Sequence, residues 1–310
     1  YTRAPYNVWL CHAYAACSMI VGQKKVAADV YMRAKRLVPQ EPTIFYFERK
    51  CAQWQDKETD RESLIEAFPM LFTLPKADGE RLRSIIAKLA NPFIVINMEK
   101  EGIDREELPM LLRWGLEKEA GDQQRLALSL ALRMDQDKAI PILKSYLALP
   151  DKWCKAKLAA CDILFCLGVE EPIYSWTEEG KQELKSRFAA AFRADMANED
   201  LPFQRLQRKG RLSERELRMT VYLWQQYLQL NADPPDAKEC HALVKGMQML
   251  SQNLCNSGER TLTALRGGRG HMLCRIQHVL EPHFLPVLET MPEEEDEKSQ
   301  KNQLLFPSMG

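Results

Sequence analysis

Three side chains near the C-terminal end have the types and the spacing of metal ligands. His271, Cys274 and His278 are separated by three and four residues, so a helix would place them on one face. Imidazole nitrogen and thiolate sulfur are common ligands of zinc. The run has no paired Cys-x-x-Cys, however, and ligands on a single helix need a further ligand from another element. We therefore expect an ordinary helix face without a bound metal or cofactor, and zinc binding is the alternative.

Basic side chains gather in two C-terminal segments, one at a predicted helix start and one around a glycine-rich loop. Their members are Arg208, Lys209, Arg211, Arg215, Arg266 and Arg269. Cations beside the backbone N–H donors of a helix N-terminus can bind phosphate, either of a small ligand or of a nucleic acid. The loop lacks the lysine and the spacing of a nucleotide-binding motif, and it follows no predicted strand. A solvated face, or a docking site for the acidic C-terminal tail, is the simpler interpretation.

Residue patterns for covalent catalysis are weak. Cys240 and His241 are neighbours in a predicted helix, where adjacent side chains point about 100° apart, so they are poorly placed as nucleophile and base. No serine lies in the sequence pattern of a nucleophile elbow. The acidic residues follow the distribution of ordinary helix-surface charge. We therefore expect a protein that is not an enzyme.

Composition narrows the class of protein further. The 310 residues include 43 basic and 43 acidic side chains, so no overall field draws the chain toward nucleic acid or anionic lipid. No apolar run approaches the roughly 20 residues that cross a bilayer, which argues against a membrane protein. The nine cysteines lie mostly in apolar helical patterns, as free thiols do in a reducing compartment. These features predict a soluble, cytoplasmic protein.

Apolar residues recur at three and four positions along nearly the whole chain, which predicts an all-α fold. The expected helices are 8–21, 24–38, 43–54, 63–72, 79–89, 93–100, 105–118, 123–134, 137–147, 152–167, 178–196, 213–230, 237–254 and 271–280. The rhythm breaks between residues 168 and 177, where we expect a short extended segment. Ser213 and Glu216 have the spacing of a capping box at a helix start.

The first two helices have the pattern of a helical hairpin, turned at Gly22 and stopped by Pro39. Ala27 and Ala34 are small enough for the helices to approach closely, and Tyr31 fills the space between them. Such a hairpin cannot bury its apolar face alone, so neighbouring helices must stack on it. A weaker echo of the spacing falls at Ala139, Leu143, Tyr146, Leu149 and Pro150.

With Ala27, Tyr31, Ala34 and Pro39 in these positions, residues 8–39 resemble the tetratricopeptide repeat (TPR) family. The first helix departs from the family at Cys11, Tyr14, Ala15 and Ser18, where tryptophan, leucine, glycine and tyrosine are usual. The resemblance implies a right-handed superhelix of antiparallel hairpins, and irregular HEAT-like repeats are the alternative for 60–168. We expect a TPR-like region over 1–168, a C-terminal helical region over 169–290 and an acidic flexible tail over 291–310.

In that family the first helix of each hairpin lines a concave groove. Carried over residue by residue, the groove positions are Trp9, His12, Ala16, Met19 and Ile20. This lining suits a hydrophobic peptide or helix of a partner protein, and it lacks the cationic residues that clamp acidic chain ends. Alternatively, these residues pack against a segment upstream of residue 1. The resemblance thus implies a non-enzymatic adaptor or scaffold, and binding of nucleic acid or a phosphate ligand by the basic C-terminal region is the alternative.

Overall fold

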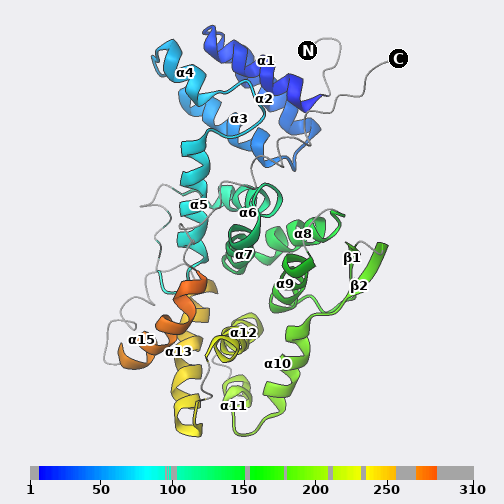
Figure 1. Cartoon of the computed structure of the whole chain (residues 1–310), viewed down its shortest axis with the longest axis vertical. Helices are drawn as coiled ribbons and strands as arrows, with labels where there is room; N and C mark the ends of the chain where they lie inside the picture. Colours follow the sequence, from blue (N-terminus) through cyan, green and yellow to red (C-terminus); the bar gives the residue numbers. More distant parts are fainter. Residues whose placement is uncertain are drawn as a thin grey trace, which may run out of the picture.

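The computed structural model describes residues 7–94, 96, 98, 103–150, 154–177, 180–208, 212–231, 235–255 and 270–284. The described chain is mostly helical, which confirms the all-α class that the periodicity predicts. Figure 1 shows an elongated molecule in which the N-terminal helices lie at one end and the helices after residue 187 lie toward the other. Within these residues, no helix is both long enough and apolar enough to cross a bilayer.

The first four helices form a unit at the N-terminal end. They are α1 (Val8–Ile20), α2 (Lys24–Leu37), α3 (Pro42–Trp54) and α4 (Arg61–Ala67). The chain reverses between α1 and α2 at Gly22, whose φ of +81° is a backbone conformation that favours glycine. Ala27, Tyr31 and Ala34 are buried, and α2 packs against α1 as the hairpin spacing predicts.

The middle of the molecule consists of helices that pack in two layers. These elements are α5 (Lys76–Ala90), η1 (Arg105–Glu107), α6 (Leu108–Glu117), α7 (Gly121–Leu130), η2 (Ala131–Arg133), α8 (Gln136–Leu147) and α9 (Cys154–Cys166). One layer follows the contacts of α3 with α6 and of α6 with α8, and the other those of α5 with α7 and of α7 with α9. The layers approach closely at Gly115, where a Cβ atom would lie 2.5 Å from the Cβ of Ala127.

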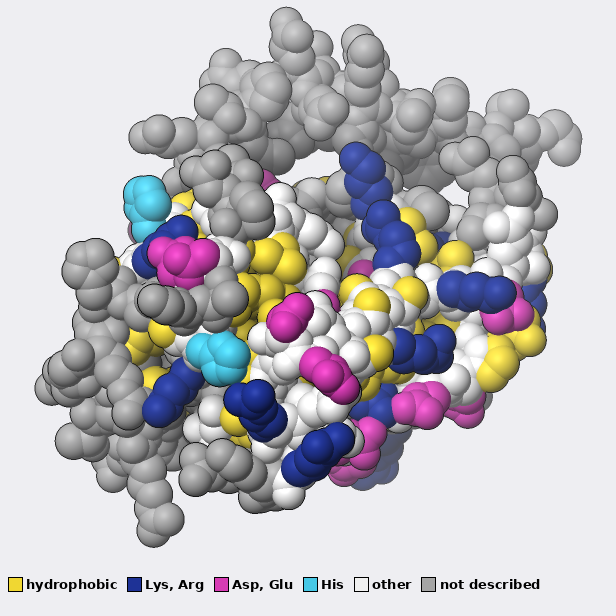
Figure 2. Space-filling model, turned by 90° about the horizontal axis from the view of Figure 1, so that it is seen from below, with side chains coloured by type: hydrophobic (Ala, Val, Ile, Leu, Met, Phe, Trp, Pro, Cys, Tyr) yellow, Lys and Arg dark blue, Asp and Glu magenta, His cyan; other side chains and the backbone are white. Residues whose placement is uncertain are grey.

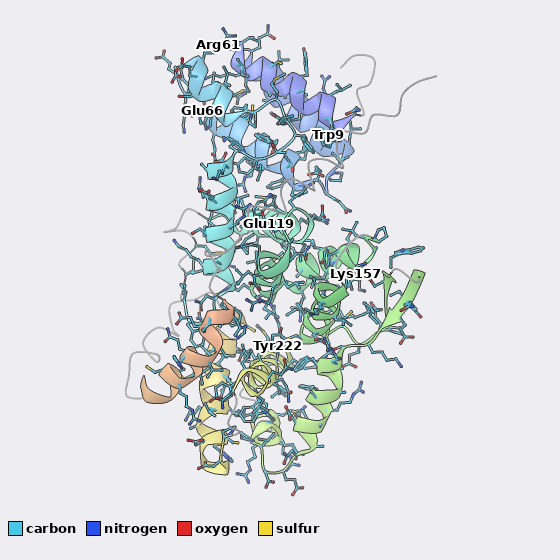
Figure 3. The ribbon with its side chains drawn as sticks, in the orientation of Figure 1. Trp9, Arg61, Glu66, Glu119, Lys157 and Tyr222 are labelled. Atoms are coloured by element: carbon cyan, nitrogen blue, oxygen red, sulfur yellow. The ribbon has the colours of Figure 1, made fainter. Side chains whose placement is uncertain are left out.

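A β-hairpin follows these layers in the sequence and precedes the last helices. The remaining elements are β1 (Ile173–Thr177), β2 (Gly180–Leu184), α10 (Arg187–Ala197), α11 (Phe203–Arg208), α12 (Glu214–Leu230), α13 (Ala237–Cys255), α15 (Gly270–Leu280) and η3 (Glu281–His283). The two strands pair antiparallel, from Ile173 opposite Leu184 to Thr177 opposite Gly180. Buried Lys157 of α9 donates a hydrogen bond to the Trp176 carbonyl and so anchors the hairpin to the helices (Figure 3).

The structure corrects three sequence-based expectations about elements. The extended segment expected between 168 and 177 is confirmed as β1, but the helix predicted over 178–196 is wrong at 180–184, which forms β2. The helix predicted over 93–100 is absent at residues 93, 94, 96 and 98; instead, the Asn91 side chain accepts a hydrogen bond from the Phe93 amide, in a tight turn. The helix expected over 63–72 ends at Ala67. The capping box of Ser213 and Glu216 is confirmed.

Buried apolar residues form two clusters. One lies among α1 to α4 and spans Cys11 to Phe68, and the other spans Leu82 to Phe284. Tyr46 and Leu74 contact both clusters, so the two cores adjoin. The larger core continues across residue 168, where we expected a boundary between regions, because α9, α10 and α12 pack together. The tail predicted over 291–310 lies outside the described residues.

A buried arginine ties the larger core together. Arg133 of η2 donates hydrogen bonds to the carbonyl oxygens of Leu89, Asn91 (2.8 Å) and Ile94 (3.0 Å), and a longer one to that of Asn253 in α13 (3.3 Å). The Asn253 side chain in turn donates to the Pro92 carbonyl at 2.7 Å. The Asn91 carbonyl also accepts from the Ile94 amide at 3.3 Å, and the Ile94 carbonyl from the Asn253 side chain at 3.5 Å, so the guanidinium completes the hydrogen bonding of a buried loop.

Candidate interaction surface

Helix α1 contains no charged residue and is apolar on both faces. Its inner face packs into the N-terminal core, where Cys11, Ala15 and Met19 are fully or almost fully buried. A helix that is apolar all round is normally enclosed by protein on every side. The outer face of α1 is therefore unusual, because it is apolar and exposed.

Three residues of this outer face and Val21, which caps the helix at its C-terminal end, follow a single line. Leu10, Tyr14, Cys17 and Val21 are separated by four, three and four residues, which is the a/d spacing of a coiled-coil helix. Leu10 is 43% exposed, Tyr14 is 41% exposed and Val21 is 64% exposed, and Cys17 is also exposed. We call these four residues the outer seam.

The segment after α4 extends the outer seam sideways. The Cys17 sulfur lies 3.4 Å from the sulfur of Met70, which is itself exposed. About two turns away on α1, Trp9 is 65% exposed and its ring centroid lies 5.4 Å from that of Phe72. Figure 3 shows Trp9 near the N-terminal end of α1. An apolar strip of this kind, formed by two segments distant in sequence, is a typical protein-binding feature.

The same segment closes the groove that the sequence predicts. His12, Ala16 and Met19 are fully buried, so they cannot line an open surface, and Ile20 is half-buried. Only Trp9 of the five predicted groove residues is largely exposed. The groove prediction is therefore wrong for these three residues: the segment after α4 covers His12, and Met19 contacts Cys51 of α3.

His12 holds that covering segment in place. Its Nε2 lies 2.8 Å from the carbonyl oxygen of Pro69 and 3.0 Å from that of Leu71, so Nε2 carries the hydrogen and donates. The other ring nitrogen, Nδ1, then accepts from the Tyr31 hydroxyl at 3.1 Å. Burial lowers the pKa of His12, and the ring also contacts that of Phe47, with centroids 4.6 Å apart. The neutral ring is thus a structural link rather than a ligand-binding group.

Two of the predicted phosphate-binding residues are described, and both form hydrogen bonds within the protein. Arg215 donates to the carbonyl oxygens of Leu132 (2.8 Å) and Met134 (2.7 Å), at the end of η2. Exposed Arg208 donates to the side-chain oxygen of Gln204 at 3.3 Å. Lys209, Arg211, Arg266 and Arg269 lie outside the described residues. Figure 2 shows Lys and Arg side chains interspersed with Asp and Glu on the face seen from below.

The predicted zinc ligands do not form a centre within the described residues. Cys274 and His278 are both exposed on α15, and the side chain of His271 is not among those described. Among the residues with described positions, no group of three His, Cys, Asp or Glu side chains is arranged to hold a metal ion. The Cys240 thiol donates weakly to the Pro235 carbonyl at 3.7 Å, and burial raises its pKa, which disfavours the reactive thiolate.

Sequence reasoning missed the outer seam, although two signals for it were present. The absence of any charge in α1 and the four-three-four spacing of Leu10, Tyr14, Cys17 and Val21 are both visible in the sequence. What the sequence does not show is which face of α1 the later segment covers.

Comparisons of the chain with protein-family models, with curated proteins and with solved structures find no match.

Proposed function

We propose that this chain is a non-enzymatic adaptor that binds an amphipathic helix of a partner protein along the outer seam of α1. The observation that carries the proposal is the exposed line of Leu10, Tyr14, Cys17 and Val21 on a helix without charge. Exposed side chains of this kind cost solvation free energy unless another apolar surface covers them. The proposed partner supplies that surface.

The spacing of the seam favours a helix over an extended peptide. Side chains at alternating intervals of four and three residues form one stripe of a helix, and a second helix at a shallow angle packs its own a/d residues between them. An extended peptide instead binds by adding main-chain hydrogen bonds to a sheet edge, which α1 lacks. The 13 residues of α1 span about 20 Å, room for roughly four turns of a partner helix.

The packing of the other helices supports the proposal that they form a scaffold that holds the outer seam in place. The hairpin of α1 and α2 and the two layers through α3, α6 and α8 and through α5, α7 and α9 are the contacts expected of stacked helical hairpins. We therefore retain a divergent TPR-like superhelix as the proposed architecture. A seam at one end of such a stack would receive the partner helix as the next layer.

A pair of matched charge substitutions tests the proposal. The probe is a synthetic helical peptide with leucine at every a and d position, and a scrambled peptide of the same composition is the control ligand. We expect the double variant Leu10→Glu/Tyr14→Glu to weaken peptide binding by about tenfold or more, measured by fluorescence anisotropy. Met32→Glu/Leu37→Glu should bind normally, because these side chains are equally exposed, at 43% and 44%, but lie on α2.

Three results would contradict the proposal. The first is equal binding by the two double variants, and the second is equal binding of the helical and scrambled peptides. The third is seam-dependent dimerisation of the wild type in sedimentation experiments, which would make a second copy of the chain the occupant. Raised salt should leave peptide binding nearly unchanged, whereas a steep loss would indicate the charge-driven, phosphate-type binding that the basic residues suggested.

A further inference from the structure

A second candidate site lies away from the outer seam, between the middle helices and the last helices. A cavity of about 380 Å³ opens between α7, α9, α10, α12 and η3. That volume falls within the range of small-molecule sites in proteins. Figure 3 shows Tyr222, which lines it, on α12 where this helix faces the middle layers. No residue of the outer seam contributes to the cavity.

Cationic side chains from three different helices meet at this cavity. Arg125 comes from α7, Lys155 from α9 and Arg187 from α10, and His283 of η3 adds an imidazole. Arg125 is also paired with Asp122 at 3.3 Å, and Arg187 is close enough to Asp162 to favour the charged form of that carboxyl group. Arg125 is close enough to His283 to contribute to the lowering of its pKa, after desolvation. Positive potential is therefore concentrated around the cavity.

The single carboxylate in the lining is already engaged. Asp162 accepts hydrogen bonds from the Ser186 hydroxyl at 2.8 Å and from the Phe188 amide at 3.1 Å. Both donors belong to the start of α10, so Asp162 serves as a cap for that helix. Burial raises the pKa of Asp162, while these hydrogen bonds act in the opposite direction. Three cationic side chains thus line the cavity with Asp162 as the one carboxylate of its wall, and Asp122, which pairs with Arg125, lies close to it.

The remaining lining offers a hydroxyl donor and an apolar wall. The Tyr222 hydroxyl forms no hydrogen bond with another described residue, and burial raises its pKa, so it stays a neutral donor. The Tyr222 ring packs edge-on against Phe188, with centroids 5.3 Å apart. Leu280 and Phe284 complete the apolar part of the wall. A polar donor without a partner in a cavity of this size is typical of a ligand site.

We infer that this cavity binds a small organic anion, whose carboxylate or phosphate lies between Arg125, Arg187 and His283 and whose apolar body contacts Phe188 and Tyr222. Guanidinium groups suit both kinds of anion, because their N–H donors match two oxygens at once. Because an inorganic ion has no apolar part to contact the apolar wall, we expect an organic anion to bind more tightly than an inorganic one. The site is independent of the proposed adaptor surface, since the two share no residue.

Binding of three probes to the full chain tests this inference: phenyl phosphate, benzoate and inorganic phosphate, titrated by calorimetry. We expect saturable binding of at least one aromatic anion, more tightly than of inorganic phosphate. Arg187→Gln should weaken that binding by about five- to tenfold, as loss of a charge-assisted contact does. Arg193→Gln is the matched control, because Arg193 is an exposed arginine of the same helix that does not line the cavity.

Tyr222→Phe keeps the ring and removes only the hydroxyl, so it should also weaken binding while circular dichroism shows an unchanged fold. Preference for phenyl phosphate over benzoate would identify the anion as a phosphate monoester, and the reverse preference would identify a carboxylate. The inference is overturned if no aromatic anion binds saturably, if inorganic phosphate binds as tightly, or if Arg187→Gln and Arg193→Gln bind equally. None of these outcomes depends on the outer seam.

Discussion

Replacement of the buried Arg133 by methionine should destabilise the protein strongly. Methionine matches the length and apolar stem of arginine but donates no hydrogen bond. The buried Leu89 carbonyl would lose its guanidinium donor, and the carbonyls of Asn91 and Ile94 would keep only the longer hydrogen bonds from the Ile94 amide (3.3 Å) and the Asn253 side chain (3.5 Å). Each such loss costs at least about 1 kcal/mol. Burial of the charged guanidinium is itself unfavourable, and it lowers the pKa of Arg133 to about 10. The methionine variant avoids this desolvation cost, which offsets part of the loss. We expect a net loss of about 2–4 kcal/mol in the free energy of unfolding.

Urea unfolding followed by circular dichroism measures this loss, with Arg83→Met as the matched control. Arg83 forms a surface ion pair with Glu119, at 3.0 and 3.1 Å, and its side chain is 42% exposed. Exposed pairs of this kind contribute about 0–1 kcal/mol, so the control should unfold near the wild-type midpoint. If Arg133→Met costs no more than Arg83→Met, the guanidinium does not hold the buried loop and the reasoning is refuted.

The remaining predictions concern the buried His12 of α1 and the packing of α6 on α7. Burial lowers the pKa of His12 below its unfolded value of about 6.5. The contribution of His12 to the free energy of unfolding is therefore fully present above that pH and falls as the solution is acidified below it. His12→Leu should show less of this acid-dependent loss in thermal melts. Gly115→Ala should destabilise the protein by about 1–3 kcal/mol, because its methyl group meets Ala127. Gly79→Ala, in open space on α5, should instead stabilise it by about 0.5–1 kcal/mol, and the opposite ranking in urea unfolding would contradict the packing of α6 on α7.

The sequence predicted those parts of the fold that depend on neighbours in the chain. Gly22 alone provides the positive φ that turns the first hairpin, and Ser213 and Glu216 cap α12 with their own side chains. In β1, Ile173 is buried and Tyr174 is exposed, which is the alternation of a strand. The strand β2 has no such signal, because most of its residues are exposed and polar, and a helix was the natural prediction there.

The surface could be predicted only in part, because burial depends on contacts between distant segments. His12 and Pro69 are 57 residues apart, and periodicity does not show that the second covers the first. For the same reason, the resemblance to the repeat family assigned the buried residues His12, Ala16 and Met19 to an open groove. Residues 93 and 94 likewise belong to a helix that the sequence predicts, yet neither is helical, and Arg133 donates to the Ile94 carbonyl from another part of the chain.

The most direct test of the proposed docking surface is the reactivity of Cys17 toward a maleimide, mapped by mass spectrometry with and without the helical leucine peptide. Cys17 lies within the outer seam, and Cys274 on α15 is an exposed cysteine far along the chain that serves as the internal control. We expect saturating peptide to slow alkylation of Cys17 by about fivefold or more and to leave Cys274 unchanged. Equal rates for Cys17 with and without bound peptide would contradict docking on α1.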